Sequence, residues 1–179
     1  MLIDPAVSAA LGLFLAVLLA ASAAHKAKTF REFAGVIENY RLAPRGAVPL
    51  IAPVILFAEA MIALCLLVPA LRAEAATLAA VLFSLYGAAM AINLLRGRRE
   101  IDCGCSFGAG GDRLTWSLVL RNLALVAAAL FVAAPAGTRE LGAFDVLTIG
   151  VFVVGGGLVY LTAEALRANW SKFVAAGYR

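Results

Sequence analysis

The sequence predicts an all-α protein, built as a polytopic bundle of transmembrane helices. Hydrophobic residues make up 64% of the 179 positions and charged residues only 15%, whereas a soluble globular chain is about half apolar and one quarter charged. The mean hydropathy is +0.96, and the charges lie between long uncharged stretches. This composition excludes a soluble enzyme, a disordered chain and a nucleic-acid-binding domain. With only 3 Cys, it also excludes a disulfide-rich secreted domain.

Five stretches are apolar enough to cross a membrane as helices. The hydrocarbon core requires about 20 apolar residues per helix, and lipid offers no hydrogen-bond partner to the edge of a sheet. We therefore expect a single integral membrane domain over residues 1–179. The predicted spans are 5–25, 47–70, 75–95, 114–134 and 145–164.

The first span, 5–25, carries no Lys, Arg, Asp or Glu. No basic residue precedes it, and its apolar run is longer than the core of a usual signal peptide. We therefore expect it to be retained as a transmembrane helix rather than cleaved.

An amphipathic helix is predicted between the first two spans, in the segment 26–45. Apolar and aromatic residues recur there at intervals of three and four, at Phe30, Phe33, Ile37 and Tyr40. This pattern is typical of a helix that lies in the membrane interface. Pro44 limits the extension of that helix.

The other four spans are rich in small residues and poor in charge. The second and fourth spans have one charge each, Glu59 and Arg121, the third has none, and the fifth has none between 146 and 163. Small residues, such as Gly87 in the third span and the three glycines at 155–157 in the fifth, let helix backbones approach closely in lipid. We therefore expect a tightly packed bundle.

The basic residues predict how the bundle is oriented. Twelve of the 15 Lys and Arg residues lie in the segments 26–45 and 96–113 and in the C-terminal tail. Only Arg72 and Arg139 lie on the opposite side. Because cytoplasmic segments are enriched in Lys and Arg, we expect an inner-membrane protein with its N-terminus outside and its C-terminus in the cytoplasm.

The sharpest chemical signal is the sequence Cys103-Gly104-Cys105, between the third and fourth spans. Gly104 allows the backbone to bend, so the two thiols could close a small ring. Disulfide geometry is demanding, and a strained disulfide is readily reduced. Basic residues at positions 96, 98, 99 and 113 flank the pair and would favour the reactive thiolate. The motif therefore favours thiol–disulfide exchange, although the residues do not indicate which cysteine attacks.

Two other interpretations of the cysteines remain open. They could bind a metal, but a closed zinc site needs about four ligands, and the chain offers only His25, Asp102 and Cys65 in addition. They could also be unreactive loop thiols. Cys65 itself lies inside the second span, where we expect it to pack in the core.

Polar residues within the spans are expected to face the interior of the bundle. Glu59 and Arg121 lie at compatible depths, and we expect an ion pair between them, either structural or part of a proton relay beneath the cysteines. Asn122 adjoins Arg121, and Asn93 ends the third span on the side of the cysteine loop. His25, the only histidine, ends the first span on that side and is a candidate for proton transfer.

The number of spans, the acidic Glu59 and the run Asp-Cys-Gly-Cys-Ser-Phe-Gly at 102–108 resemble the MauE family. These are membrane proteins of methylamine utilisation, related to the DoxX-like membrane proteins. The resemblance covers most of the chain and implies a DoxX-like four-helix core with a fifth helix. Ser106 departs from the pattern common in that family, in which the second cysteine often directly precedes Phe-Gly.

The resemblance also implies a function in protein maturation. MauE proteins are associated with maturing the disulfide-rich small subunit of methylamine dehydrogenase, together with MauD, a periplasmic thioredoxin-like protein. The charge pattern, however, puts Cys103 and Cys105 near the cytoplasm. Three arrangements stay open: electron transfer across the membrane, exchange with a quinone as in DsbB-like bundles, or an inverted orientation.

The first hypothesis is therefore a membrane thiol–disulfide redox protein that supports disulfide formation in an exported partner. A non-catalytic membrane scaffold for that maturation is the first alternative. A small-molecule transporter that uses Glu59 and Arg121 is the second. Replacing Cys103 separates the first hypothesis from the others, because neither a scaffold nor a transporter requires the thiol.

Overall fold

The computed structural model describes residues 2–99, 101 and 114–175, and within them it contains six α-helices and two short 3-10 helices. The α-helices are α1 (Pro5–Lys28), α2 (Phe30–Tyr40), α3 (Val48–Leu67), α4 (Arg72–Leu95), α5 (Trp116–Ala133) and α6 (Ala143–Ala175). The 3-10 helices are η1 (Arg45–Ala47), directly before α3, and η2 (Pro69–Leu71), directly before α4.

The predicted fold class is confirmed, because the described chain is a helical bundle of the multi-pass membrane type. Five segments are long and apolar enough to cross a membrane, and they overlap the five predicted spans. These segments are Pro5–Lys28, Arg45–Leu67, Pro69–Leu95, Trp116–Ala133 and Ala143–Leu166. The remaining helix, α2, is the short amphipathic helix predicted between the first two spans.

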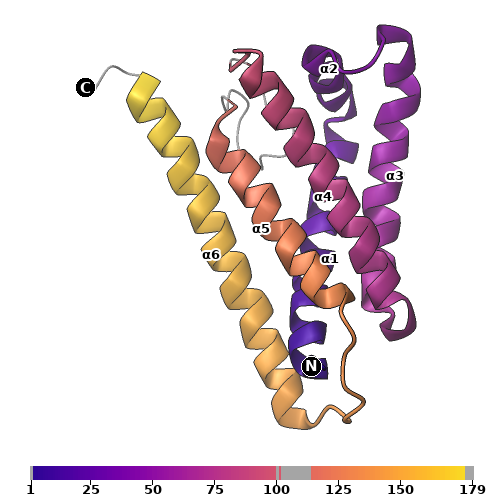
Figure 1. Cartoon of the computed structure of the whole chain (residues 1–179). Coiled ribbons are helices and arrows are strands. Elements are labelled where there is room, and N and C mark those ends of the chain that lie inside the picture. The colour runs from indigo at the N-terminus through magenta and orange to yellow at the C-terminus, as the bar shows by residue number, and fades with distance from the viewer. Residues whose placement is uncertain (1, 100, 102–113, 176–179) are drawn as a thin grey trace.

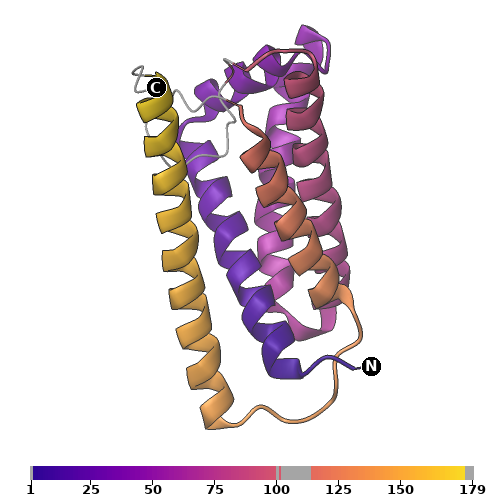
Figure 2. The ribbon, with the colours of Figure 1, turned by 60° about the vertical axis from the view of Figure 1, so that its left-hand side comes forward.

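The core of the bundle lies among α1, α3, α4 and α5, which run side by side (Figures 1 and 2). Leu15 of α1, Leu66 of α3, Ala76 of α4 and Ala129 of α5 are buried in one hydrophobic cluster. The alanines allow α4 and α5 to approach closely, as expected for helices that associate in lipid. This arrangement matches the expected four-helix core.

The fifth spanning helix, α6, lies at the edge of the bundle and packs chiefly on α1 (Figure 2). The ring of Phe14 lies beside Gly156, so a side chain at that position would contact the ring. Phe14 also meets Tyr160 edge to face, with 6.4 Å between ring centroids. Most other apolar side chains of α6 are exposed, which suits a surface that faces lipid.

The apolar face of α2 is turned toward the bundle, as its sequence predicts. Phe33 and Tyr40 are buried, whereas Phe30 is more than one-third exposed. The helix ends at Arg41, whose left-handed backbone, with φ of 50°, reverses the chain toward α3. Helix α2 therefore covers one end of the bundle (Figure 1).

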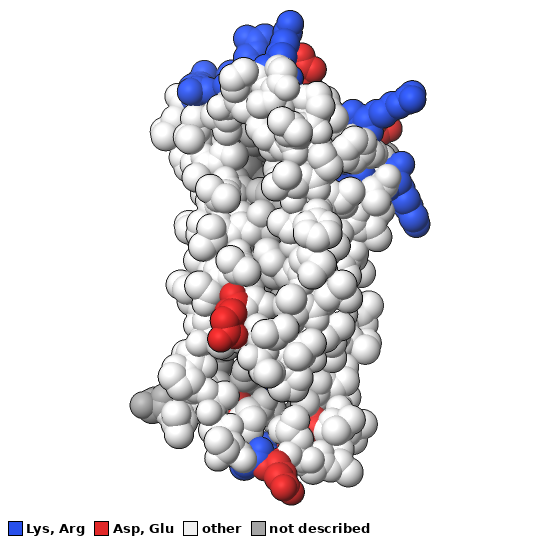
Figure 3. Space-filling model, turned by 90° about the vertical axis from the view of Figure 1, so that its right-hand side faces the viewer, with Lys and Arg blue, Asp and Glu red and all other residues white. Residues whose placement is uncertain are grey.

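The two ends of the bundle differ in charge. Helix α2, the C-terminal end of α4 and the N-terminal end of α5 share one end with the last turns of α6 (Figure 1). On the face shown in Figure 3, most Lys and Arg side chains gather at that end, and few charges interrupt the surface below it. The asymmetry inferred from the sequence is therefore present in three dimensions.

At the opposite end, Arg139 forms ion pairs with Asp4 and Asp145, a group that we call the Arg139 clasp. Its guanidinium donates to Asp4 at 2.9 Å and to Asp145 at 2.7 Å. The donation from Arg139 holds the pKa of the Asp4 carboxyl below its usual range. The amide of Ile3 also donates to the carbonyl of Pro135 at 3.0 Å. The clasp thus ties the start of α1 to the connection between α5 and α6.

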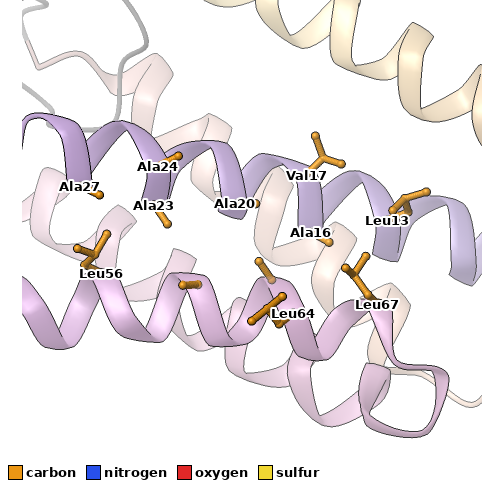
Figure 4. A pocket seen from close by; sticks show the side chains of 12 residues that line it. Leu13, Ala16, Val17, Ala20, Ala23, Ala24, Ala27, Leu56, Leu64 and Leu67 are labelled. Carbon is orange, nitrogen blue, oxygen red and sulfur yellow. The ribbon is translucent and has the colours of Figure 1, made fainter.

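An apolar groove of about 570 Å³ runs between α1 and α3 (Figure 4). Its lining consists only of Ala, Val and Leu side chains, with Ala16, Ala20 and Ala23 along α1 and Leu56 and Leu64 on α3. The groove has no polar side chain in its lining, so the candidate chemistry of the chain lies elsewhere.

Candidate functional site

A buried polar cluster joins α1, α3 and α4. The side chain of Glu59, on α3, is fully buried and forms an ion pair with Lys26 of α1. The hydroxyl of Tyr86, on α4, donates to Glu59 Oε1 at 2.7 Å, and the hydroxyl of Ser22 donates to the same oxygen at 3.2 Å. We call these four residues the Glu59 cluster.

The periodicity of α1 explains why Ser22 and Lys26 both reach Glu59. They are four residues apart, and residues at that spacing lie on one face of a helix. The Lys26 ammonium also lies 5.1 Å from the ring centroid of Phe33 and 4.8 Å from that of Tyr86, close enough for favourable cation–π contacts. Phe33 belongs to α2, so this helix covers the cluster from the end of the bundle.

A second ion pair fixes α6 to the bundle. Arg121 Nη1, on α5, donates to Glu164 Oε1, on α6, at 3.2 Å. Both side chains are mostly buried, with 13% and 14% exposed. In lipid, such a pair places both charges against protein rather than hydrocarbon.

The predicted ion pair between Glu59 and Arg121 is wrong. Glu59 pairs with Lys26, and Arg121 pairs with Glu164. The physical reason is that α1 continues past the predicted span end at 25, which brings Lys26 into the bundle beside Glu59. Helix α6 in turn carries Glu164, at the last position of the fifth predicted span, next to Arg121. Glu59 and Arg121 nevertheless line the same small cavity, of about 20 Å³, together with Asn122.

The two asparagines within the spans are both buried, but they have different partners. Asn122 Nδ2 donates to the carbonyl of Leu118 at 2.8 Å. Asn93 Nδ2 donates to the carbonyl of Ala89 at 3.1 Å, and its Oδ1 accepts from Arg98 at 3.1 Å. Asn93 is therefore part of the anchor of the loop that follows α4.

Arg98 anchors the start of the cysteine loop on α2. Its Nη2 donates to the carbonyl of Asn39 at 2.8 Å and its Nη1 to that of Tyr40 at 3.3 Å. The amide of Leu114 donates to the carbonyl of Arg99 at 2.9 Å, which joins the two ends of the loop. These contacts define what we call the loop root.

The loop root also has an apolar side. Ile101 and Leu114 are buried in one hydrophobic cluster with Tyr40 of α2 and Met90 of α4. Ile101 precedes the first cysteine of the motif by two positions. Cys103, Gly104 and Cys105 themselves lie outside the described residues, so the structure establishes where their loop leaves and rejoins the bundle.

The other two candidates from the sequence lie within α1 and α3. His25 is half-buried next to Lys26, and its carbonyl accepts from the Thr29 amide at 3.0 Å; its proposed part in proton transfer stays a prediction. Cys65 is half-buried and packs against the main hydrophobic core. Cys65 thus has the packing position expected for it.

Sequence reasoning missed Lys26, Tyr86, Ser22 and Glu164. In the sequence, Lys26 begins the basic segment 26–45, and a charge after an apolar run indicates the end of a span. The spacing of Ser22 and Lys26 was the available signal, since it places both on the helix face that contains the buried Leu15 and Leu19.

Comparison with known proteins then identifies the family. The family model described as "Methylamine utilisation protein MauE" matches residues 4–135, a stretch that contains the Glu59 cluster, the loop root and the cysteine motif. This chain belongs to the MauE family. No solved structure matches it.

Curated MauE relatives match over most of their length. The "Methylamine utilization protein MauE" of Paracoccus denitrificans is 42% identical over 171 residues, which cover 92% of this chain and 89% of the relative. The protein of that name from Methylophilus methylotrophus is 39% identical, over 91% of this chain and 87% of its own length. The one from Methylorubrum extorquens is 40% identical, over 87% and 83%.

Our first prediction concerns the buried ion pair. Replacing Lys26 with Met leaves the Glu59 carboxylate buried without its cation, so the free energy of unfolding should fall by about 3–5 kcal/mol, and by less where the carboxyl takes up a proton. The double change Lys26→Met with Glu59→Gln should be milder than Lys26→Met alone. Unfolding in mixed detergents, followed by circular dichroism, measures both.

The matched control is Lys28→Met, which alters an exposed lysine two positions further along α1 and should change stability little. Losses that simply add in the double variant would contradict the pairing, because residues in contact do not behave additively.

A second prediction concerns the loop root. Replacing Arg98 with Ala removes its hydrogen bonds to α2 and Asn93, at a cost of about 1–2 kcal/mol. The Leu114 amide should then exchange its hydrogen roughly tenfold faster, and proteases should cleave within 100–113 more readily. Hydrogen exchange with mass spectrometry measures the first effect. The exposed Arg96→Ala is the control, and equal exchange rates in both variants would show that Arg98 does not anchor the loop.

Proposed function

We propose that this MauE-family protein is a membrane thiol–disulfide redox protein whose reactive groups are Cys103 and Cys105. The observation that supports this most strongly is the Cys-Gly-Cys motif in a loop whose two ends are hydrogen-bonded together and buried. The anchored ends fix where the loop leaves and rejoins the bundle. The spacing of the cysteines favours exchange over a structural disulfide.

The proposed chemistry is a two-step exchange. The thiolate of one cysteine attacks a partner disulfide, forms a mixed disulfide and releases one partner thiolate. The other cysteine then attacks the mixed disulfide, so that the pair is oxidised and the partner is reduced by two electrons. In the reverse direction, the disulfide of the pair oxidises a partner dithiol. The exposed Arg96 and Arg99 add positive charge near the loop, which favours the thiolate.

We also propose partners for this exchange. The relatives are named for methylamine utilisation, and we propose a MauD-like thioredoxin-fold protein as the exchange partner. The final recipient would be an exported protein with disulfides, such as the small subunit of methylamine dehydrogenase.

We also propose that the protein lies in the cytoplasmic membrane with its N-terminus outside and its C-terminus in the cytoplasm. The gathering of Lys and Arg at the end that carries α2 supports this orientation (Figure 3). It puts the cysteine loop near the cytoplasm, so electrons exchanged with a periplasmic partner would have to cross the membrane.

The orientation predicts which side is accessible to reagents. In a background without the three native cysteines, Arg31→Cys and Glu140→Cys place single exposed thiols at the two ends of the bundle. An impermeant thiol reagent on intact cells should label Glu140→Cys and should label Arg31→Cys only after lysis. The reverse pattern would invert the orientation.

The central functional test uses single cysteine variants. Replacing Cys103 or Cys105 with Ser should abolish maturation of the partner, and one of the two variants should accumulate a mixed disulfide, because the resolving thiol is gone. Non-reducing gels followed by mass spectrometry detect that adduct. Cys65→Ser is the matched control, since this half-buried cysteine packs in the core, and it should keep maturation. Full maturation activity in both loop variants would favour the scaffold function instead.

A further inference from the structure

A cavity of about 310 Å³ lies beneath α2, between this helix and α3 and α4. Phe33 and Tyr40 line it from α2, Ile55 from α3, and Leu85 and Met90 from α4. We call it the α2 pocket. The side chain of Leu85 is 61% exposed on an apolar, lipid-facing part of the surface, so an apolar molecule dissolved in the membrane can reach the pocket from the side.

One wall of the α2 pocket contains two side chains with hydrogen-bond donors. Lys26 and Tyr86 belong to its lining, and both are members of the Glu59 cluster. An ammonium has three N–H donors. Within the described part of the chain, Lys26 donates to Glu59 and Tyr86, which leaves one donor for a ligand. The pocket therefore suits an apolar molecule with a hydrogen-bond acceptor at one end.

The α2 pocket also adjoins the loop root. Tyr40 and Met90 line the pocket and pack in the same hydrophobic cluster as Ile101 and Leu114. A ligand in the pocket would thus lie against the side chains that hold both ends of the cysteine loop. This adjacency connects the pocket to the proposed redox pair.

We propose that the α2 pocket binds the ring of a lipid-soluble quinone and that this quinone takes the electrons of the cysteine pair. This inference rests on the proposed thiol–disulfide function. A membrane-bound dithiol that must return to its disulfide needs an acceptor of two electrons and two protons, and a quinone is the class of lipid-soluble molecule that accepts both.

The electron and proton balance is complete. The thiols of Cys103 and Cys105 together lose two electrons and two protons, and an S–S bond forms between them. The quinone gains the two electrons, and its two carbonyl oxygens gain the two protons to become the hydroxyls of a quinol. Lys26 donates a hydrogen bond to one carbonyl oxygen and stabilises the negative charge that builds there as electrons arrive.

An alkyl chain alone would not require this site. An alkyl chain would bury its apolar surface equally well in the aliphatic groove between α1 and α3, which has no polar side chain in its lining. In the α2 pocket, by contrast, the cation lies among two aromatic rings, an environment that suits a flat ring with a carbonyl edge.

Direct binding of decylubiquinone to the full-length protein in nanodiscs tests the pocket. Ile55→Trp fills the pocket and should weaken binding tenfold or more, and Ile37→Trp should do the same from the α2 side. Val54→Trp is the matched control, because Val54 neighbours Ile55 but is 64% exposed and lies outside the lining, and it should bind as the native protein does. n-Decyl-β-maltoside, with the same chain length and no quinone ring, should not compete.

Electron transfer is tested in the same samples. The prereduced native protein should convert decylubiquinone to quinol at one equivalent per protein, whereas Ile55→Trp should react at least tenfold more slowly. The Cys103→Ser variant should bind the quinone with native affinity and reduce none of it.

The experiments distinguish failure of the quinone pocket from failure of the thiol function. Equal binding by native protein and Ile55→Trp, or displacement by n-decyl-β-maltoside, would overturn the quinone pocket while the thiol function still stood on the mixed-disulfide test. Quinone reduction by Cys103→Ser at the native rate would overturn the cysteines as electron donors and with them the inference.

Discussion

The buried ion pair between Lys26 and Glu59 is the constraint on which the rest of this bundle depends. A carboxylate inside a membrane protein is costly unless a cation and hydrogen bonds compensate it, and Glu59 obtains these from α1 and α4. That requirement fixes how three helices face one another. It also fixes α2, because Phe33 closes over the ammonium. The position of α2 in turn provides the backbone carbonyls that hold Arg98 and the loop root.

The apolar framework could be predicted from the sequence because hydropathy and helix length are local properties. The amphipathic helix was also predictable, since Phe33 and Tyr40 recur at helical spacing and both are buried. Lys26 shows where this reasoning fails. A charged residue at the edge of an apolar run indicates the end of a membrane helix, yet here the helix continues to Lys28 and Lys26 is buried.

The pairing of the charges was not predictable because it depends on tertiary structure. Depth along the helices made Glu59 and Arg121 compatible, and they do line the same small cavity. The pairing depends on which face each helix turns inward: α1 presents Lys26 to Glu59, and α6 presents Glu164 to Arg121. The depth of a residue along its helix does not indicate which way its side chain faces. The cysteine motif, by contrast, could be recognised from the sequence alone, because its chemistry rests on covalent spacing.

The residues on which the proposed function depends gather at one end of the bundle. Helix α2 contacts both the loop root and the Glu59 cluster there, so the loop that contains Cys103 and Cys105 leaves and rejoins the bundle on the helix that covers this buried polar cluster. The measurement that tests this account most directly is the redox state of Cys103 and Cys105 in the membrane, obtained by differential alkylation after mild oxidation and after mild reduction, with the mass of the 101–113 peptide as readout. The account predicts a reversible shift of two alkyl groups between the two conditions. A pair that stays fully reduced in both would contradict it.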